Sequence, residues 1–217
     1  FAQALGISDA ISFDMGGTTA KTSMIENGEL ARSPDIHVGG GILIGSRLLT
    51  GAGYLLKVPA VDLAEVGAGG GSIVAIDAGG AIRVGPRSAG ASPGPACYDT
   101  GGEDPTVTDA NLILGYINPV YLVGGDLKLN AGKARSVFTK RIAEPLSMEL
   151  ERAAHGVYRI TVATMTRAIR AVSTERGRDP RRCTLFAFGG NGPVFAAQVA
   201  ATLGIRRILI PPSPGVF

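Results

Sequence analysis

The sequence predicts an α/β fold, and three segments carry that prediction. Residues 10–25 form two apolar runs separated by a glycine-rich turn, which is typical of two adjacent strands. Residues 150–177 place apolar side chains at every third or fourth position, which predicts a long amphipathic helix. Residues 184–210 have the pattern of strand, glycine-rich turn, helix and strand. We expect one stripe of the long helix to pack against the sheet, namely Leu150, Val157, Met165 and Val172.

Turn residues divide the rest of the first half of the chain. Asn27-Gly28 follows an alternating run and predicts a tight hairpin, because both residues tolerate the positive φ that such turns need. Residues 72–76 and 82–84 flank a second turn and predict another hairpin. The remaining stretches are less regular: residues 36–66 show scattered glycines, and residues 87–104 predict an ordered loop.

Helix signals dominate the second half. Residues 108–111 can cap a short helix that runs to Gly115, and Asn130 can cap another over residues 131–143. Gly177 is expected to end the long helix, and Pro180 prevents it from resuming.

Composition excludes several classes of protein. The 217 residues are 45% hydrophobic and 18% charged, enough for a buried core, and the formal charge of +3 gives no basic field for nucleic acid. Arginines do gather in residues 167–182, but Glu175 and Asp179 lie among them, so we expect a solvated helix end. No apolar run is long enough to cross a bilayer and no signal core is present, which indicates a cytoplasmic protein that does not bind membranes.

Cysteine and histidine are too sparse for a disulfide framework or a zinc site. Cys97 and Cys183 lie far apart in the sequence, so buried reduced thiols are expected. Only His37 and His155 are available as imidazole ligands.

The strongest chemical motif spans residues 14–21, between the first two predicted strands. Glycines let the backbone approach an anion, threonine hydroxyls and backbone N–H groups can donate to phosphate oxygens, and a strand-terminal Asp can hold hydrated Mg²⁺. A tight hairpin whose Asp bonds its own turn is the alternative. The spacing is not that of a P-loop. The candidate residues are Asp14, Gly16, Gly17, Thr18, Thr19 and Lys21, with Asp14 as the catalytic and metal-binding group.

A second motif follows the strand at 184–188. Its glycine-rich turn exposes the N-terminal amides of a helix and leaves room for a flat ligand against the backbone. Small residues needed only for packing are the alternative. The candidates for cofactor binding are Gly189, Gly190, Asn191 and Gly192.

Two further clusters have less specific signals. Residues 67–72 form a glycine run preceded by Asp62 and Glu65, and can be either an anion-binding loop or a flexible turn. Residues 105–111 are polar and can face a site, although helix capping explains Thr108 and Asp109 equally well.

Taken together, five segments resemble the hydantoinase A family, which includes N-methylhydantoinases, 5-oxoprolinases and subunits of acetone carboxylases. The resemblance covers essentially the whole chain; Asn191 stands where members often have Ala, and Lys21 where many have Asp. The segments are residues 12–19, 67–73, 94–98, 105–115 and 187–193.

The resemblance implies the second lobe of an actin-like ATPase (ribonuclease H-like) fold with a family-specific insertion. Residues 14–19 would be a phosphate loop and residues 189–193 the adenosine loop. Family members carry a further phosphate loop in a first lobe that this chain lacks, so we expect a fragment of a longer protein. The implied segments are phosphate-loop strands at 1–35, an inserted glycine-rich region at 36–130, and a helical part with the adenosine loop at 131–217.

The implied activity is ATP-dependent opening of a cyclic amide such as hydantoin or 5-oxoproline. ATP and Mg²⁺ would be the cofactors, and a hydantoinase B-type subunit or domain the partner. Phosphorylation of the ring oxygen makes an inert amide a better electrophile, and the chain shows no Ser or Cys nucleophile beside a His base. The alternatives are a kinase-like or non-catalytic nucleotide-binding module, an acetone-carboxylase-type subunit, and an inert structural piece.

Overall fold

The computed structural model describes residues 1–34, 36–38, 43–44, 54–120, 122 and 125–217. These residues form a mixed α/β structure with two compact units. The first unit comprises Phe1–Gly67 and Val162–Phe217, and the second Ala68–Thr161. The glycine-rich region expected at 36–130 is therefore divided between the two units.

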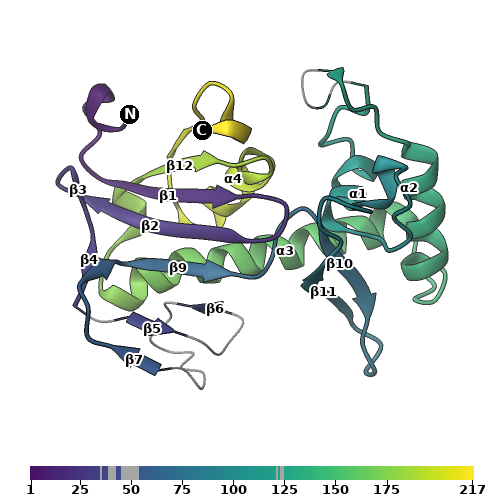
Figure 1. Ribbon diagram of the computed structural model, residues 1–217, viewed down its shortest axis with the longest axis horizontal. Coiled ribbons are helices and arrows are strands. Elements are labelled where there is room, and N and C mark those ends of the chain that lie inside the picture. Colours follow the sequence, from purple (N-terminus) through teal and green to yellow (C-terminus); the bar gives the residue numbers. More distant parts are fainter. Residues whose placement is uncertain (35, 39–42, 45–53, 121, 123–124) are drawn as a thin grey trace. The chain divides into compact units, whose positions relative to one another are not determined.

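The first unit is built on a seven-stranded sheet in which β1 is central (Figure 1). β1 pairs in parallel with β12 on one side and antiparallel with β2 on the other, as the strand, turn, strand pattern predicted. β13 pairs in parallel with β12, while β9, β6 and β3 extend the other edge. The strands are β1 (Ala10–Met15), β2 (Ala20–Glu26), β3 (Glu29–Leu30), β6 (Leu43–Ile44), β9 (Leu63–Val66), β12 (Thr184–Phe188) and β13 (Arg207–Leu209).

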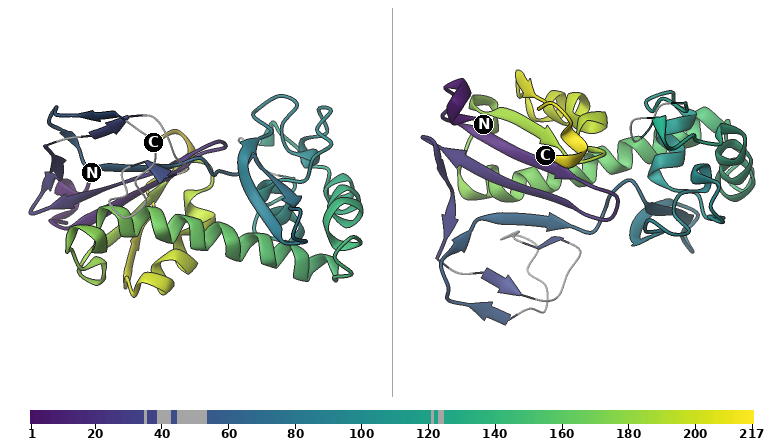
Figure 2. Two further views of the ribbon diagram at one scale, coloured as in Figure 1. Left: turned by 90° about the horizontal axis from the view of Figure 1, so that it is seen from below. Right: turned by 45° about the horizontal axis from the view of Figure 1, so that its top comes forward.

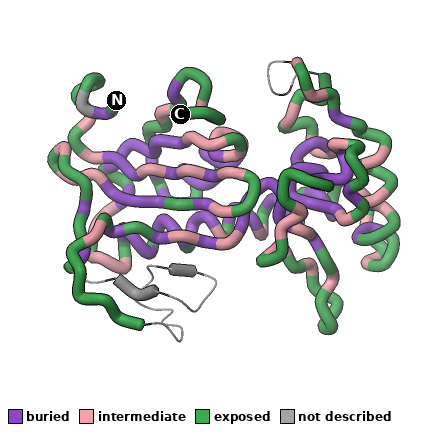
Figure 3. Tube along the Cα trace, in the orientation of Figure 1, coloured by how far each residue is buried: buried purple, intermediate pink, exposed green. Residues whose placement is uncertain are grey.

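The C-terminal part of α3 (Leu150–Val172), which belongs to the first unit from Val162 on, and α4 (Gly192–Leu203) lie on one face of this sheet (Figure 2). Buried and partly exposed residues alternate along β1 (Figure 3). Ile11, Phe13 and Met15 are at most 1% exposed, whereas Ser12 and Asp14 are partly exposed. Because successive strand residues point to opposite faces, Asp14 stands on the face away from the helices.

The expected stripe of α3 is shared between the two units. Met165 and Val172 belong to the first unit, where Val172 packs with Ala64 of β9. Leu150 and Val157 belong to the second unit, so the expectation that the whole stripe covers this sheet is wrong for its N-terminal half. The helix ends at Val172, earlier than predicted, and a 3-10 turn, η5 (Thr174–Arg176), leads to Gly177 at φ +75°.

The first unit also contains pairs of short strands outside the main sheet. The Asn27-Gly28 hairpin is confirmed, with φ of 52° and 81° at the two residues. Residues 39–42 and 45–53, part of the stretch in which no element was predicted, lie outside the described residues. The paired short strands are β4 (Arg32–Ser33) with β8 (Ala60–Val61), and β5 (Ile36–Val38) with β7 (Tyr54–Leu56).

The second unit combines a hairpin with short helices. The predicted hairpin forms from β10 (Ser72–Ile76) and β11 (Ile82–Ser88). Asn130 caps α2 (Ala131–Phe138), as predicted, and a π-helical turn continues it over Thr139–Ala143. The cap of α1 (Val107–Ile113) is Thr106, not the predicted Thr108. Further 3-10 turns among the described residues are η1 (Gln3–Leu5), η2 (Ala96–Tyr98), η6 (Pro180–Arg182) and η7 (Pro214–Val216).

No helix in the described ranges is both long and apolar enough to cross a bilayer.

Candidate functional site

The two glycine-rich turns singled out in the sequence leave the same edge of the first unit's sheet. Asp14 pairs with Phe188 in the parallel register of β1 and β12, so the chain enters both turns side by side. Loops that follow adjacent parallel strands form the usual ligand-binding edge of α/β sheets. Residues 14–19 and 189–193 therefore leave the same sheet on the same side.

Asn191 ties the two turns together through two hydrogen bonds. Its backbone N–H donates to the Met15 carbonyl at 2.8 Å. Its side-chain Nδ2 donates to the Gly16 carbonyl at 3.2 Å. Gly16 N–H in turn donates to the Thr19 carbonyl at 3.1 Å, which closes the β1–β2 turn. The two turns therefore form a single hydrogen-bonded structure.

Close backbone approach requires glycine at residue 189 and leaves little room for a side chain at residue 192. Gly189 has φ +78°, and a Cβ there would overlap the Asp14 carboxylate and lie 2.6 Å from the Met15 carbonyl oxygen. A Cβ at Gly192 would lie 3.2 Å from the Phe13 carbonyl oxygen. No side chain fits at residue 189 without moving the end of β1.

The residues predicted to bind the nucleotide differ in solvent exposure. A methyl group added at Gly17 would have no atom within 4 Å, so the backbone there faces open space. Asp14 is partly exposed and stands on the sheet face opposite the helices. Of the other predicted residues, Thr18, Lys21 and Gly190 are exposed, Gly16, Thr19, Gly189 and Asn191 are partly exposed, and Gly192 is buried.

Lys21 shares the open face of the sheet with Asp14. The two residues are register partners on β1 and β2, and Lys21 is paired in turn with Glu65 on β9. Lys21 Nζ lies 3.9 Å from Glu65 Oε1. A row of three charged side chains therefore crosses three strands next to the turns.

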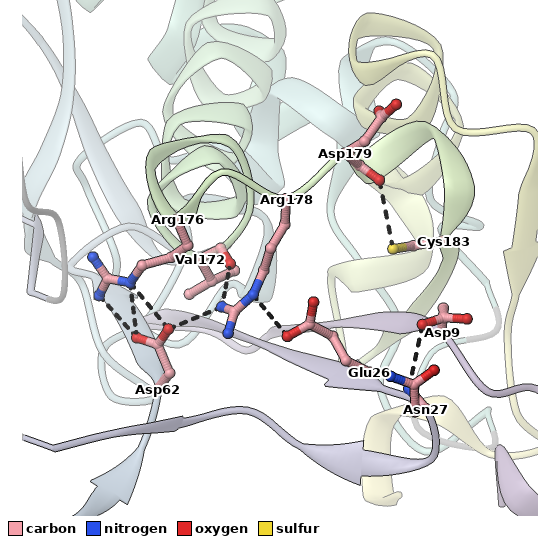
Figure 4. Close-up of polar contacts among 9 residues, drawn as sticks. All are labelled: Asp9, Glu26, Asn27, Asp62, Val172, Arg176, Arg178, Asp179 and Cys183. Atoms are coloured by element: carbon pink, nitrogen blue, oxygen red, sulfur yellow. Dashed lines mark hydrogen bonds and ion pairs between the residues drawn. The ribbon is translucent and has the colours of Figure 1, made fainter.

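Asp62 is the buried centre of an ion-pair network that sequence reasoning missed (Figure 4). Its side chain is 4% exposed and accepts from Arg176 Nη2 at 2.8 Å and from Arg178 Nη1 at 3.1 Å. Arg178 also pairs with Glu26 at 2.8 Å. The expectation that the arginines of residues 167–182 form a solvated helix end is therefore wrong for Arg176 and Arg178.

The network determines the charge state of Asp62. Burial acts to raise the pKa of this carboxyl, but the hydrogen bonds and charges of Arg176 and Arg178 outweigh it and hold the pKa below its usual value. The carboxylate links the start of β9 to the chain that follows α3, so its role is structural.

In the second unit, the polar residues of 105–111 serve mainly to organise the chain. The Asp109 carboxylate is fully buried and accepts from Cys97 N at 2.7 Å, Thr106 N at 2.9 Å and Thr106 Oγ1 at 2.7 Å. Thr106 and Asp109 form a capping box, which the Thr-x-x-acidic spacing signals in the sequence. Asp109 is therefore not available as a ligand group in this structure.

The glycine run at 67–72 folds as a tight turn held against α1. Ser72 N donates to the Gly69 carbonyl at 3.1 Å, and Gly69 N donates to Ser72 Oγ at 2.9 Å. The Gly70 carbonyl accepts from both Thr108 N at 2.8 Å and Thr108 Oγ1 at 2.9 Å. The loop is thus ordered by its neighbours.

Both cysteines are buried free thiols, as predicted. Burial raises the pKa of Cys97, and the nearby Asp109 carboxylate raises it further. Burial also raises the pKa of Cys183 to about 11. Across the described ranges, no three His, Cys, Asp or Glu side chains are grouped to hold a metal ion.

An open pocket of about 390 Å³ in the first unit lies away from the two turns. It is lined by Arg170, Thr174, Thr202, Leu203 and residues 177–181. Residues 177–181 come before β12, whereas Gly189 follows that strand. It is therefore separate from the candidate site.

The chain matches the hydantoinase/oxoprolinase family over residues 1–217. It belongs to this family. It is 48% identical over 217 residues to an uncharacterized protein of Methanocaldococcus jannaschii, covering 32% of that protein. It is 42% identical over 210 residues to the alpha subunit of a caprolactamase of Pseudomonas jessenii, covering 97% of this chain and 28% of the subunit.

Two solved structures are similar over 99% of the chain. A nucleotide-free acetone carboxylase superposes with a TM-score of 0.83 at 29% identity, the chain covering 28% of it. The ATP-dependent caprolactamase from Pseudomonas jessenii superposes with a TM-score of 0.79 at 38% identity, with 30% covered. The chain thus spans about a third or less of the length of these relatives.

Proposed function

We propose that this chain is the nucleotide-facing part of an ATP-dependent enzyme that opens a cyclic amide of the hydantoin or 5-oxoproline type. The observation that carries the proposal is that the turns after β1 and β12 lie side by side and are joined by two hydrogen bonds from Asn191. Membership of the hydantoinase/oxoprolinase family and similarity to an ATP-dependent caprolactamase support it. An actin-like ATPase fold has two lobes. The first unit of this chain, Phe1–Gly67 with Val162–Phe217, corresponds to the second of those lobes, and the fold carries a family-specific insertion.

The residues present fit a nucleotide. Gly16, Gly17 and Thr18 form a turn whose backbone faces open space at Gly17, as close approach to phosphate oxygens requires. The backbone at Gly190 has open space around it, which leaves room for the flat adenine of the adenosine part. The adenosine and phosphate parts of ATP would then bind at adjacent turns of one sheet edge.

Asp14 fits Mg²⁺ as a single carboxylate at the edge of this cradle. Mg²⁺ in nucleotide sites keeps several waters and binds through one or two carboxylates and the phosphates, so a dense cluster of acidic residues is not needed. When bound, Mg²⁺ would neutralise charge on the transferred phosphoryl group. Lys21, on the same face, adds a positive charge next to the turn.

The chemistry follows from the inertness of an amide. The carbonyl oxygen of the ring amide would attack the terminal phosphorus of ATP with ADP as the leaving group, and loss of the N–H proton would give a phosphorylated imidate. Water would then add to the former carbonyl carbon, the carbon–nitrogen bond would break with protonation of the nitrogen, and phosphate would depart. Catalysis of the transfer depends on positioning and charge neutralisation, which backbone amides and Asp14 would supply. A hydantoinase B-type subunit or domain would contribute to the hydrolytic step.

Phosphate release from ATP by the complete protein with its partner tests the proposal. We expect release to depend on hydantoin or 5-oxoproline and to match ring opening in amount. ATP hydrolysis without any dependence on a cyclic amide would instead favour a kinase-like or non-catalytic module.

A second candidate, ketone carboxylation, is favoured by the similarity to acetone carboxylase. Stimulation of ATP hydrolysis by acetone with bicarbonate, and not by cyclic amides, would select it.

A further inference from the structure

Asn111 carries a buried side-chain amide with neither polar atom hydrogen-bonded. It lies on α1 of the second unit and is 0% exposed. Within the described part of the chain, neither Oδ1 nor Nδ2 has a hydrogen-bond partner. Burial of an amide without partners opposes folding, because the hydrogen bonds it made with water are not replaced. Such a group in a folded protein calls for a specific explanation.

The neighbours of Asn111 on α1 all have partners. Thr106 and Asp109 bond each other, and Thr108 donates twice to the Gly70 carbonyl. Thr108 faces the glycine loop, because it bonds the Gly70 carbonyl. Residues three apart on a helix are neighbours on its surface, so Asn111 lies next to Thr108 on that side of α1. The unpaired amide is therefore specific to Asn111 and lies beside residues 69–72.

We propose that Asn111 recognises the amide group of the cyclic substrate through a pair of hydrogen bonds. This inference rests on the proposed function. In a five- or six-membered lactam the amide is cis, so its N–H and C=O point to the same side of the ring. A primary carboxamide offers a C=O acceptor and an N–H donor along one edge. The two edges are complementary: Oδ1 accepts from the ring N–H while Nδ2 donates to the ring C=O.

The substrate reaches Asn111 only after a local movement, because both polar atoms are closed off from solvent. The adjacent loop, Gly69–Gly71, carries no side chains, although its backbone is buried. It accepts two hydrogen bonds from Thr108 at the Gly70 carbonyl and one from Ala89 N at the Gly71 carbonyl. A shift of this loop breaks these bonds, and the bonds that Asn111 makes with the substrate offset part of that loss.

If Asn111 is kept unpaired to bind substrate, the ligand-free protein is less stable with Asn111 than with an apolar side chain at that position. The stability of the ligand-free protein therefore distinguishes substrate recognition from a structural role. If Asn111 instead held a permanent partner such as an internal water, its removal would destabilise the protein.

The test compares thermal melting of the complete wild-type protein with Asn111→Leu, which is apolar and has the same number and branching of side-chain heavy atoms. Without ligand, we expect the melting temperature of Asn111→Leu to be unchanged or higher. With a non-hydrolysable ATP analogue, hydantoin and 5-oxoproline should raise the melting temperature of the wild type but not of the variant. A cyclic ketone, which lacks the N–H, should raise that of the wild type less. The KM for the cyclic amide should rise roughly 10- to 100-fold in Asn111→Leu, the scale of losing two hydrogen bonds.

Thr166→Val is the matched control. Thr166 is 4% exposed on α3, and its hydroxyl also lacks a hydrogen-bond partner in the described ranges. This variant should keep the full response to cyclic amides.

A lower melting temperature or failure of Asn111→Leu to fold would overturn the inference, and so would an undiminished response to cyclic amides. If the wild type and Asn111→Leu both open the cyclic amide with the same KM, this inference alone is removed. If ATP hydrolysis by the wild type depends on no cyclic amide, the proposed function is removed as well.

Discussion

Gly189 lies so close to Asp14 that a methyl group added at residue 189 would overlap the Asp14 carboxylate. The contact joins the turn after β12 to the end of β1, and Asn191 reinforces it with bonds to Met15 and Gly16. A side chain that would bind Mg²⁺ is thus positioned by the backbone of the segment that would bind adenosine. Changes at residue 189 should therefore affect the carboxylate directly.

Gly189→Ala should strongly lower nucleotide-dependent turnover. The substitution combines strain at φ +78° with a collision against Asp14 and the Met15 carbonyl, so the end of β1 must move. We expect a loss of roughly 100-fold or more in the turnover of ATP by the complete protein, the scale of a misplaced catalytic group.

Gly80→Ala is the control for that experiment. Gly80 has the same φ of +78° in the β10–β11 turn, but nothing lies within 4 Å of its added methyl position. Backbone strain alone should lower stability by about 1 kcal/mol and leave turnover nearly unchanged. Equal losses of turnover in the two variants would show that collision with Asp14 has no special effect.

Asp62→Asn should destabilise the first unit strongly. Removal of one partner from a buried ion pair leaves the other charges uncompensated, which costs about 3 kcal/mol or more. Arg176 and Arg178 would lose their shared carboxylate, although Arg178 would keep Glu26. Urea denaturation measures the free energy of unfolding, and Glu151→Gln is the control, because its pair with Arg135 is about half exposed.

The stabilising effect of Asp62 should disappear in acid. The pKa of Asp62 is lowered in the folded protein from 3.8, so folding favours the ionised form. Its contribution is present above that value and is lost as the pH falls through the folded pKa. The difference in unfolding free energy between wild type and Asp62→Asn should be constant above about pH 5 and shrink below about pH 4. A difference that does not change between neutral and acid pH would contradict the role of the charge.

Asn191→Ala should have only a small effect. The backbone bond from residue 191 to Met15 remains, and only the bond from Nδ2 to Gly16 is lost. A single neutral hydrogen bond that is partly exposed contributes about 1 kcal/mol. We expect turnover to change by less than about tenfold. A loss as large as that of Gly189→Ala would mean that the Asn191 side chain contacts the nucleotide.

Local patterns predicted much of this fold. The alternation in residues 10–25, the Asn27-Gly28 turn and the strand, turn and helix after Thr184 each depend on neighbours in sequence, and each has the predicted structure. The adjacency of the two turns needed the resemblance to a family, because nothing local pairs β1 with β12. The Thr106-x-x-Asp109 spacing is itself a local signal, and it marks the cap of α1 correctly where Thr108 does not.

Features that depend on distant residues could not be read from the sequence. The partners of Asp62 lie more than a hundred residues further along the chain, so Arg176 and Arg178 have the sequence pattern of a solvated basic segment. Whether a polar residue such as Asn111 finds a partner is likewise decided only by tertiary packing.

Asp14→Asn addresses the candidate catalytic group itself. The amide has the size of the carboxylate and can keep the close approach of Gly189, so folding should be nearly unchanged. It lacks the charge that would hold Mg²⁺ at the phosphates, and loss of such a contact in the transition state lowers the turnover number by roughly 100-fold or more. Asp77→Asn is the control, because the Asp77 carboxylate accepts from Gly79 N and Ala81 N within its own turn. Steady-state ATP hydrolysis by the complete protein, with circular dichroism to verify folding, measures the effect. If a folded Asp14→Asn variant turns over at a near-normal rate, the β1–β2 turn is a simple hairpin and Asp14 has no part in catalysis.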